Sequence, residues 1–414
     1  MKEKYKLYVA DLIKQKKMEL GINSKELSER SNVSKSYLSK IENGSYLGSM
    51  ETINFIFNVF DIEFYYEGEK FDELSELMDE YIINQIKAND TKAIIEKIIS
   101  YHENAVYSAL AEKYYLCRFI NSVLMKDEFE YWDKEFNRIS KLIIIDSKIK
   151  HIYLDFKGVL HKNNNDYQNA IKYLIEAKNL GKFEYTSSMV SYHLSYTYGK
   201  INNLLDAYRL AVEARDSFNK ESNWKREWYT ECHIANLFSR SGEFQIANKM
   251  YLDLIQRYDE VGSVLMKNTV KVNLMWNYMK QLKWSEALQI LEKTEENEFD
   301  MFKISYFHCA YCYFKLNQFE LMNLWIEKGL SLKLDNDTRT LLEMLRILSD
   351  NLIDEDERIK KLLKCKKNNE DCIELETLII INNEIRNYAE TNFKYKIAYE
   401  VTKELLTTKA TFVV

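Results

Sequence analysis

Apolar side chains recur along the chain at spacings of three or four residues, which is the pattern of amphipathic helices. The first such pattern covers residues 5–20, and its shared face is expected to consist of Leu7, Leu12, Ile13 and Met18. From about residue 71 onward one helical pattern follows another, and the turns between them contain Asn, Asp or Gly. The pattern therefore predicts an all-α protein.

Capping residues divide the first sixty positions into short helices. Asn23 and Glu26 have the spacing of a capping box at the start of a helix over residues 24–31. Ser34 is placed to cap a helix over residues 35–43. A fourth helix is expected after Ser49, with an inward face of Ile53, Phe57 and Phe60. Two short capped helices joined by a tight turn indicate a helix-turn-helix bundle.

Residues 22–44 resemble the helix-turn-helix of the Cro and phage-repressor (XRE) family. The matching positions are Leu27, Val33, Ser34, Leu38, Ile41, Glu42 and Gly44. Three residues depart from the family pattern, because Ser24 replaces a Gln that caps onto a phosphate, Ser28 replaces an Ala, and Gly48 replaces a Pro. The resemblance implies a DNA-binding domain over residues 1–66.

The resemblance also implies a recognition helix that starts at residue 35 and lies in the major groove. The positions that match base-facing residues are Lys35, Ser36, Ser39 and Lys40. The positions that match phosphate-contacting residues are Ser24, Ser34 and Asn43, and Lys16 and Lys17 are expected to add backbone charge. Lys donates to guanine acceptors, and Ser reaches bases or phosphates. The alternative is a solvated basic face without a DNA target.

A second pattern repeats through the rest of the chain. Each unit opens a helix with an aromatic residue or Leu, which is followed three positions later by Ala or, in one unit, Met. These pairs are Tyr167/Ala170, Leu204/Ala207, Phe244/Ala247, Trp284/Ala287, Phe319/Met322 and Tyr395/Ala398. The first five second members are separated by 37, 40, 40 and 35 residues. Two positions before the first member, the turn carries Asn165, Asn202, Gly242 or Asn317. These residues tolerate a left-handed backbone.

This pattern resembles an elongated tetratricopeptide repeat. Less clear units are expected at Ala93, Trp132 and Ile359, which gives about nine hairpins over residues 75–410. The resemblance implies a right-handed superhelical solenoid over residues 91–414, with residues 67–90 as a linker helix or first repeat helix. The apolar tail over residues 407–414 is expected to be covered by a homodimer contact or by the last groove.

The repeat register also predicts a concave groove. Its lining combines aromatic, amide and basic side chains, namely Tyr192, His193, Tyr196, Lys200, His233, Asn236, Arg240, Asn273, Trp276, Lys280, Phe307, His308, Tyr311 and Lys315. Aromatic rings supply contact area, Asn pairs with both groups of an extended backbone, and Lys or Arg holds a carboxylate. We expect a short peptide here, although such residues are also ordinary at these repeat positions.

Composition narrows these expectations. The 414 residues include no Pro and only 10 Gly, which disfavours tight-turned β-barrels and flexible linkers. Residues 1–50 carry a net charge of +4 and the remaining residues −10, so a nucleic-acid site is expected only at the start of the chain. No apolar run approaches a membrane span and no signal peptide is evident, so we expect a cytoplasmic protein with reduced Cys.

A few positions have spacings that bear on catalysis or metal binding. Cys309 and Cys312 form a Cys-x-x-Cys pair inside a predicted helix, where packing is the favoured interpretation. His193, His233 and His308 fall in one repeat column, but successive repeats are too far apart for them to share a metal ion. No phosphate loop or catalytic triad pattern occurs. The sequence is therefore not expected to encode an enzyme, and neither cofactor nor metal is expected.

A Cro-like domain followed by tetratricopeptide repeats resembles the peptide-pheromone receptors of the Rap/Rgg/NprR/PlcR/PrgX group (RRNPP). The resemblance implies a homodimeric transcription regulator that binds a double-stranded DNA operator and is controlled by a short oligopeptide pheromone, as in quorum sensing. Two alternatives remain open. One is a module that binds and inhibits a folded partner such as a response regulator. The other is a phage or mobile-element repressor controlled by a peptide.

Overall fold

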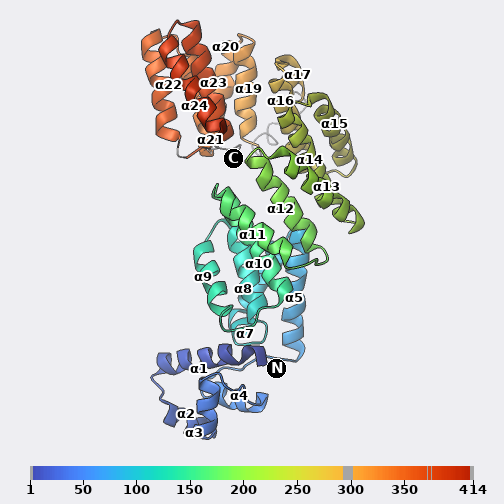
Figure 1. Ribbon diagram of the computed structural model, residues 1–414, viewed down its shortest axis with the longest axis vertical. Helices are drawn as coiled ribbons and strands as arrows, with labels where there is room; N and C mark the ends of the chain where they lie inside the picture. Colours follow the sequence, from blue (N-terminus) through green and yellow to red (C-terminus); the bar gives the residue numbers. More distant parts are fainter. Residues whose placement is uncertain (1–2, 292–301, 371, 374, 411–414) are drawn as a thin grey trace. The chain divides into compact units, whose positions relative to one another are not determined.

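The protein is helical throughout the part that the computed structural model describes, which is residues 3–291, 302–370, 372–373 and 375–410. In the described part the only extended pairing is an isolated bridge between Tyr65 and Ser108. The side chains of the apolar tail, residues 407–414, lie outside the described residues. The expectation of an all-α protein is thus confirmed (Figure 1).

The helices follow one another with short connections. In chain order they are η1 (Glu3–Tyr5), α1 (Lys6–Leu20), α2 (Ser24–Ser31), α3 (Lys35–Glu42), α4 (Met50–Asn58), α5 (Glu69–Ile86), α6 (Lys92–Ser100), α7 (His102–Val106), α8 (Ala111–Met125), α9 (Phe129–Ile139), α10 (Ser147–Asn163), α11 (Tyr167–Asn179), α12 (Thr186–Lys200), α13 (Leu204–Lys220), α14 (Trp224–Ser241), α15 (Phe244–Glu260), α16 (Val264–Lys280), α17 (Trp284–Gln289), α19 (Ile304–Lys315), α20 (Phe319–Leu330), α21 (Asn336–Ser349), α22 (Glu355–Asn369), α23 (Leu375–Thr391) and α24 (Tyr395–Ala410).

Two compact units account for these helices. Unit 1 consists of Met1–Lys200 and Arg209–Glu227, and unit 2 consists of Ile201–Tyr208 and Trp228–Val414. Helices α13 and α14 therefore contribute residues to both units. Unit 1 contains the four short helices α1 to α4 together with the first helix pairs, and unit 2 contains the later pairs.

The capping residues act as the sequence predicts. The Asn23 side chain accepts hydrogen bonds from the N–H groups of Lys25 and Glu26, each at 3.0 Å. Ser34 and Ser49 accept from the N–H groups three residues later, at 3.3 and 3.2 Å. Local side-chain acceptors thus set the starts of α2, α3 and α4.

The expected inward face of α1 is partly wrong. Leu12 and Ile13 are buried, but Leu7 is 43% exposed and Met18 is 83% exposed. The buried face is instead completed by Tyr8, Val9 and Ala10, and Tyr5 of η1 is buried directly before the helix. The helix buries this aromatic side because it packs against both the short helices and the first repeat helices, as described below.

The repeat register is confirmed. The first members of the six repeat pairs are the first residues of α11, α13, α15, α17, α20 and α24. The second members are buried in every case. Antiparallel neighbours in contact include α10 with α11, α16 with α17, α19 with α20 and α23 with α24. The same pairing holds for α5 with α6, α8 with α9 and α21 with α22, where the sequence indicates weaker units.

The turn that joins the two helices of each pair contains a left-handed residue. Asn165, Asn202, Gly242 and Asn317 have φ values of 60°, 62°, 89° and 59°. Leu282 and Phe393 occupy the equivalent turn position with φ values of 60° and 57°. The geometry of the hairpin therefore imposes this conformation even on residues that disfavour it.

Small residues allow the paired helices to approach closely. A Cβ added to Gly158 on α10 would lie 2.5 Å from Leu174 Cγ on α11. A Cβ added to Gly329 on α20 would lie 3.0 Å from Tyr306 Cβ on the paired helix α19, and 2.7 Å from Leu342 Cδ1 on α21 of the next pair. These contacts explain why the repeat carries its small residues where the sequence places them.

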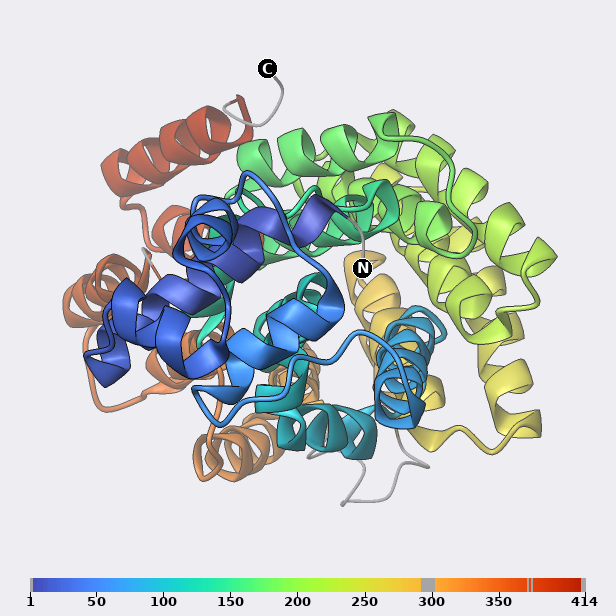
Figure 2. The same ribbon diagram turned by 90° about the horizontal axis from the view of Figure 1, so that it is seen from below.

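Within unit 1, helix α1 and the residues just before it are tied to the first repeat helices. The Tyr5 hydroxyl donates to the carbonyl of Ala109 at 2.7 Å, and the Tyr8 hydroxyl donates to that of Val106 at 2.8 Å. Arg138 on α9 pairs with Asp11 on α1 at 2.8 Å. Figure 1 shows α1 beside α7, and the short helices face the viewer in Figure 2.

Candidate functional site

Helix α3 presents a polar face to solvent. Its apolar residues Leu38 and Ile41 are buried against the bundle, at 1% and 0% exposure. All four side chains that the sequence assigns to base edges are exposed, and they are Lys35, Ser36, Ser39 and Lys40. The helix thus has the polarity that a major-groove helix requires, and none of the described residues covers this face.

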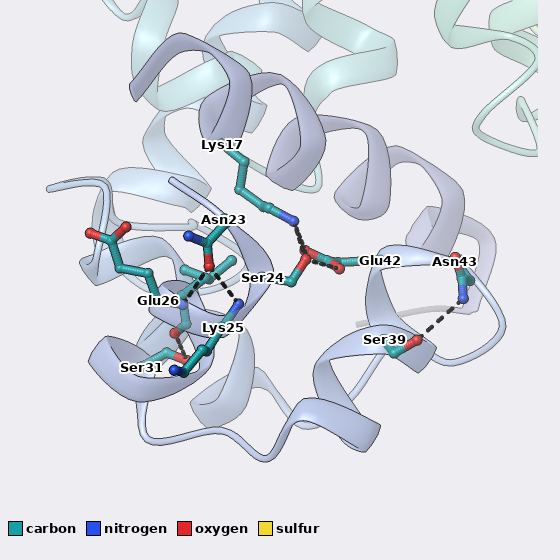
Figure 3. Close-up of polar contacts among 10 residues, drawn as sticks. Lys17, Asn23, Ser24, Lys25, Glu26, Ser31, Ser39, Glu42 and Asn43 are labelled. Carbon is teal, nitrogen blue, oxygen red and sulfur yellow. Dashed lines mark hydrogen bonds and ion pairs between the residues drawn. The ribbon is translucent and has the colours of Figure 1, made fainter. Parts of the chain in front are cut away.

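The residues assigned to phosphate contacts, Ser24, Ser34 and Asn43, are exposed as well, although all three are already engaged in hydrogen bonds. Ser34 caps α3 through its hydroxyl oxygen. Asn43 donates from its amide to the Ser39 hydroxyl at 3.5 Å, which brings together two of the assigned residues (Figure 3).

Ser24 belongs to a polar cluster that joins three helices. Lys17 on α1 donates to Ser24 at 2.5 Å and to Glu42 on α3 at 2.6 Å, and the Ser24 hydroxyl donates to Glu42 at 3.2 Å (Figure 3). The carboxylate of Glu42 lies beside Ser24, the first residue of α2, where the positive end of the helix dipole favours a negative charge. Lys17 is therefore held within the protein, and Lys16 likewise pairs with Glu19 at 2.6 Å.

The other two departures from the family pattern have local explanations. The Ser28 hydroxyl donates to the carbonyl of Val33 at 2.6 Å, so it bridges the turn between α2 and α3. Gly48 has a φ of 88°, a value that Pro cannot adopt. A left-handed junction thus stands where the family has a proline.

In unit 2, the predicted groove residues lie on α14, α16 and α19. Asn236, Asn273, Trp276 and Tyr311 are half-buried, and Arg240 is exposed. The Trp276 and His308 rings stack with centroids 5.3 Å apart, and Lys280 lies over Trp276 at 5.8 Å. The structure therefore brings the α16 and α19 side chains together into one aromatic and basic surface.

Several of these side chains are occupied internally. Asn236 accepts from the Tyr251 hydroxyl at 2.5 Å, and Asn273 donates to the Cys232 sulfur at 3.4 Å. His233, Phe307 and His308 are buried, at 6%, 0% and 6% exposure, and so offer little surface to a ligand. Burial also lowers the pKa of Lys280 and lowers that of His308 to about 3.

Glu384 on α23 is a site residue that the sequence reasoning did not include. Its carboxylate accepts from the Tyr311 hydroxyl at 2.6 Å and from Lys315 at 2.9 Å on both oxygens. The repeat register could have identified it. Glu384 precedes the repeat residue Ala398 by fourteen positions, and the predicted groove residue His308 precedes Met322 by the same number. Lys315 was expected to bind the carboxylate of a ligand, but in the structure it binds the carboxylate of Glu384.

The remaining predicted groove residues belong to α12 in unit 1. His193 contacts the buried carboxylate of Asp155 through Nδ1 at 2.8 Å. Tyr192 packs against the rings of His193, Tyr196 and Phe218. Lys200 is half-buried at the end of the helix. This part of the surface is therefore also aromatic, with one pair of a buried acid and a half-buried imidazole.

The Cys-x-x-Cys pair is part of the core. Cys309 and Cys312 are buried as free thiols at 2% and 0% exposure. Burial raises the pKa of Cys309 and raises that of Cys312 to about 12, so both remain protonated at neutral pH. No group of three potential metal ligands occurs among the described residues.

The sequence of the short-helix region matches a known family. Residues 13–66 match the family model described as helix-turn-helix. They form a helix-turn-helix domain. No curated protein matches the chain by sequence. Among the described helices, none combines the length and apolar character needed to cross a bilayer.

The larger part of the chain shares its fold with solved structures of Rap and NprR. A Rap protein complexed with competence and sporulation factor matches 83% of this chain and 99% of its own, with a TM-score of 0.67 and 14% identity. The apo quorum sensor NprR from B. thuringiensis covers 82% and 99%, with a TM-score of 0.60 and 15% identity. NprR in complex with its cognate peptide NprX covers 80% and 99%, with a TM-score of 0.55 and 16% identity. The chain thus has a helix-turn-helix domain on the tetratricopeptide-like fold of Rap and NprR.

Proposed function

We propose that the protein is a transcription regulator that binds double-stranded DNA through α3 and is controlled by a short oligopeptide. The observation that carries the proposal is the exposed polar face of α3 on a capped helix-turn-helix. Lys35 and Lys40 supply donors for guanine, and Ser36 and Ser39 lie beside them on the same face. Sequence-specific binding is expected to need a homodimer that reads two half-sites.

The peptide part of the proposal is supported by the half-buried aromatic and amide side chains of α14, α16 and α19 within unit 2. Trp276 and Tyr311 offer flat apolar area, and Lys280 and Lys315 lie over aromatic rings beside them. NprR has been solved with a cognate peptide and shares this fold. We expect the bound peptide to change the affinity of the protein for DNA.

The first test is a double substitution in α3. We expect Lys35→Ala with Lys40→Ala to weaken binding to the selected DNA by about 2 kcal/mol, roughly thirtyfold, because two base- or phosphate-directed cations are lost. The probe is a pool of random-sequence duplexes from which the wild-type protein enriches its site, followed by fluorescence anisotropy with the enriched duplex. The salt dependence of the affinity should also become shallower.

The control is Lys182→Ala with Lys220→Ala, which removes the same charge from exposed positions in the repeat part of unit 1. This variant should bind the enriched duplex as the wild type does. Equal losses in both variants would show that only net charge matters and would remove α3 as the recognition helix. If no duplex is enriched but a folded protein such as a response regulator binds, the partner-inhibiting alternative is favoured.

A further inference from the structure

Unit 1 contains a cavity on the side where the start of α1 meets the repeat helices α9, α10 and α11. Its volume is about 590 Å³, which is within the range of small-ligand pockets. The lining comes from η1, the first turn of α1, the end of α9, the connection between α9 and α10, and the facing sides of α10 and α11. The lining includes none of the predicted groove or DNA-binding residues. The cavity is therefore a separate candidate site.

The charges around this cavity select an anion. The lining contains five lysines and two glutamates, although the whole chain has a net charge of −6. Lys141 is exposed, and its ammonium group has no hydrogen-bond or ion-pair partner among the described residues. Lys150 pairs with Glu176 at 3.4 Å, but the two side chains are 48% and 45% exposed, and such a pair contributes little. Both ammonium groups are thus available to an anionic ligand.

Two other lysines of the lining are neutralised by acids that lie outside it. Lys157 donates to both carboxylate oxygens of Asp133 at 3.1 Å. Lys4 is paired with Glu112. The positive charge that remains for a ligand is therefore concentrated at Lys141 and Lys150.

The accessible apolar part of the lining is aliphatic. Leu7 on α1 and Ile144 in the α9–α10 connection are 43% and 77% exposed. Leu142 and Ile145 in the same connection are half-buried. A hydrocarbon chain that covers these side chains would remove apolar surface from water, which is favourable.

The aromatic rings of the lining already have contacts that a flat ligand ring would need. Tyr173 stacks on His161 with centroids 5.1 Å apart, and the Lys157 ammonium lies over it, 5.1 Å from its centroid. Tyr153 stacks on Phe136 with centroids 4.2 Å apart and is only 6% exposed. A nucleobase binds by stacking on an accessible ring. The lining therefore favours an aliphatic chain over a nucleotide.

The neutral donors of the lining are engaged as well. The Asn137 amide donates to the carbonyl of Asp133 at 2.8 Å, and the Ser140 hydroxyl donates to the carbonyl of Asn137 at 2.8 Å. The Tyr153 hydroxyl donates to the Asp133 carboxylate at 2.7 Å. A peptide backbone needs such groups as partners for its carbonyls. The lining therefore favours a ligand that has no peptide bonds.

We propose that this cavity binds an unbranched aliphatic acid. The carboxylate accepts from Lys141 and Lys150, and the hydrocarbon chain lies along Leu7, Leu142 and Ile144. The site is independent of the proposed control by a peptide, because it uses different residues and a different class of ligand.

The test compares four probes by isothermal titration calorimetry with the full chain. They are decanoate, octanoate, decan-1-ol below its solubility limit and adenosine 5′-monophosphate. Decanoate should bind about tenfold tighter than octanoate, because two buried methylene groups are lost. Decanoate should also bind at least about tenfold tighter than decan-1-ol, which lacks the charge. Adenosine 5′-monophosphate should bind more weakly than decanoate.

Two variants with matched controls locate the site. Lys141→Gln should weaken decanoate binding about fivefold, whereas Lys134→Gln, at an exposed position of α9 outside the lining, should not. Ile144→Glu places a like charge beside the carboxylate and should weaken binding about tenfold or more. Its control is Ile99→Glu, since Ile99 is 36% exposed and lies outside the cavity. Circular dichroism checks that all four variants are folded.

Sedimentation with phosphatidylglycerol vesicles distinguishes a free acid from the lipids of a membrane. The proposal expects decanoate binding without vesicle binding. Binding to vesicles in the absence of decanoate binding would assign this surface to a membrane and overturn the cavity as an acid site. Equal affinities for decanoate and decan-1-ol, tighter binding of adenosine 5′-monophosphate, or wild-type affinity in both Lys141→Gln and Ile144→Glu would also overturn it. None of these outcomes bears on peptide control, which is tested with the enriched duplex.

Discussion

At the scale of single residues, His308 shows how the repeat core constrains a titratable group. Its imidazole lies flat on Trp276, and its Nδ1 atom has no hydrogen-bond partner among the described residues. Burial lowers the pKa of His308 to about 3. The folded protein therefore keeps this side chain neutral down to strongly acidic pH, whereas an unfolded chain binds the proton below about pH 6.5.

This difference predicts an acid-sensitive stability. Because the unfolded state binds more protons than the folded state between about pH 6.5 and pH 3, the free energy of unfolding falls as the pH falls through that window. His308→Leu removes this contribution. We expect the free energy of unfolding of the variant, measured by urea denaturation, to fall less steeply than that of the wild type below pH 6.5. The two slopes should differ by up to about 1.4 kcal/mol per pH unit. Parallel curves for wild type and variant would contradict the assignment.

At the scale of elements, α19 and α23 are joined across an intervening repeat helix. Glu384, at 6% exposure, holds Tyr311 and Lys315 of α19 from its position on α23. A buried carboxylate with three charge-assisted or hydroxyl hydrogen bonds stabilises more than an exposed ion pair. The contact therefore fixes the spacing of these two helices within unit 2.

Glu384→Gln tests this contact. The amide still accepts from Tyr311 but loses its charge, so we expect the variant to be less stable by about 1–3 kcal/mol in urea denaturation. The matched control is Glu390→Gln on the same helix, where the pair with Arg386 is long, at 3.9 Å, and Glu390 is 55% exposed. That control should change stability by less than about 0.5 kcal/mol. A loss of similar size in both variants would argue against a special role for Glu384.

Local signals explain why much of the element pattern follows from the sequence. The caps at Asn23, Ser34 and Ser49 act on residues two or three positions away, so they are visible without a structure. The repeat anchors are visible because one supersecondary unit recurs. The buried side of α1 was less predictable, because Tyr8 contacts a carbonyl ninety-eight residues away in the sequence. The Glu384 contact does not follow from one helix alone, since it joins α23 to α19, about seventy residues earlier in the sequence.

At the scale of the whole molecule, the attachment of α1 to the repeat helices connects the helix-turn-helix domain to the rest of unit 1. The Tyr8 hydroxyl is fully buried and donates to the carbonyl of Val106, and the Tyr5 hydroxyl donates to that of Ala109. The helix-turn-helix is therefore held by specific hydrogen bonds in addition to apolar contacts. A signal that reaches α7 or α8 can act on α1 through them.

Tyr8→Phe should loosen this attachment. The buried carbonyl of Val106 loses its side-chain donor, and we expect a loss of about 1–2 kcal/mol in the stability of the α1 contact. Hydrogen exchange of the α1 amides is the measurement, and it should accelerate while exchange in unit 2 stays unchanged. Tyr46→Phe is the control, since Tyr46 is 42% exposed. If exchange accelerates equally in both variants, the hydroxyl of Tyr8 does not hold the helix.

The left-handed turns of the repeat have a practical consequence. Leu282 and Phe393 adopt φ values of 60° and 57° while their side chains are 71% and 77% exposed. Neither side chain contributes much burial, and each residue bears a conformational cost of about 1 kcal/mol that Gly or Asn largely avoids. Leu282→Asn and Phe393→Asn should therefore raise the melting temperature without altering any buried side chain. Substitution at these two positions is therefore a first step toward a more thermostable variant for crystallisation.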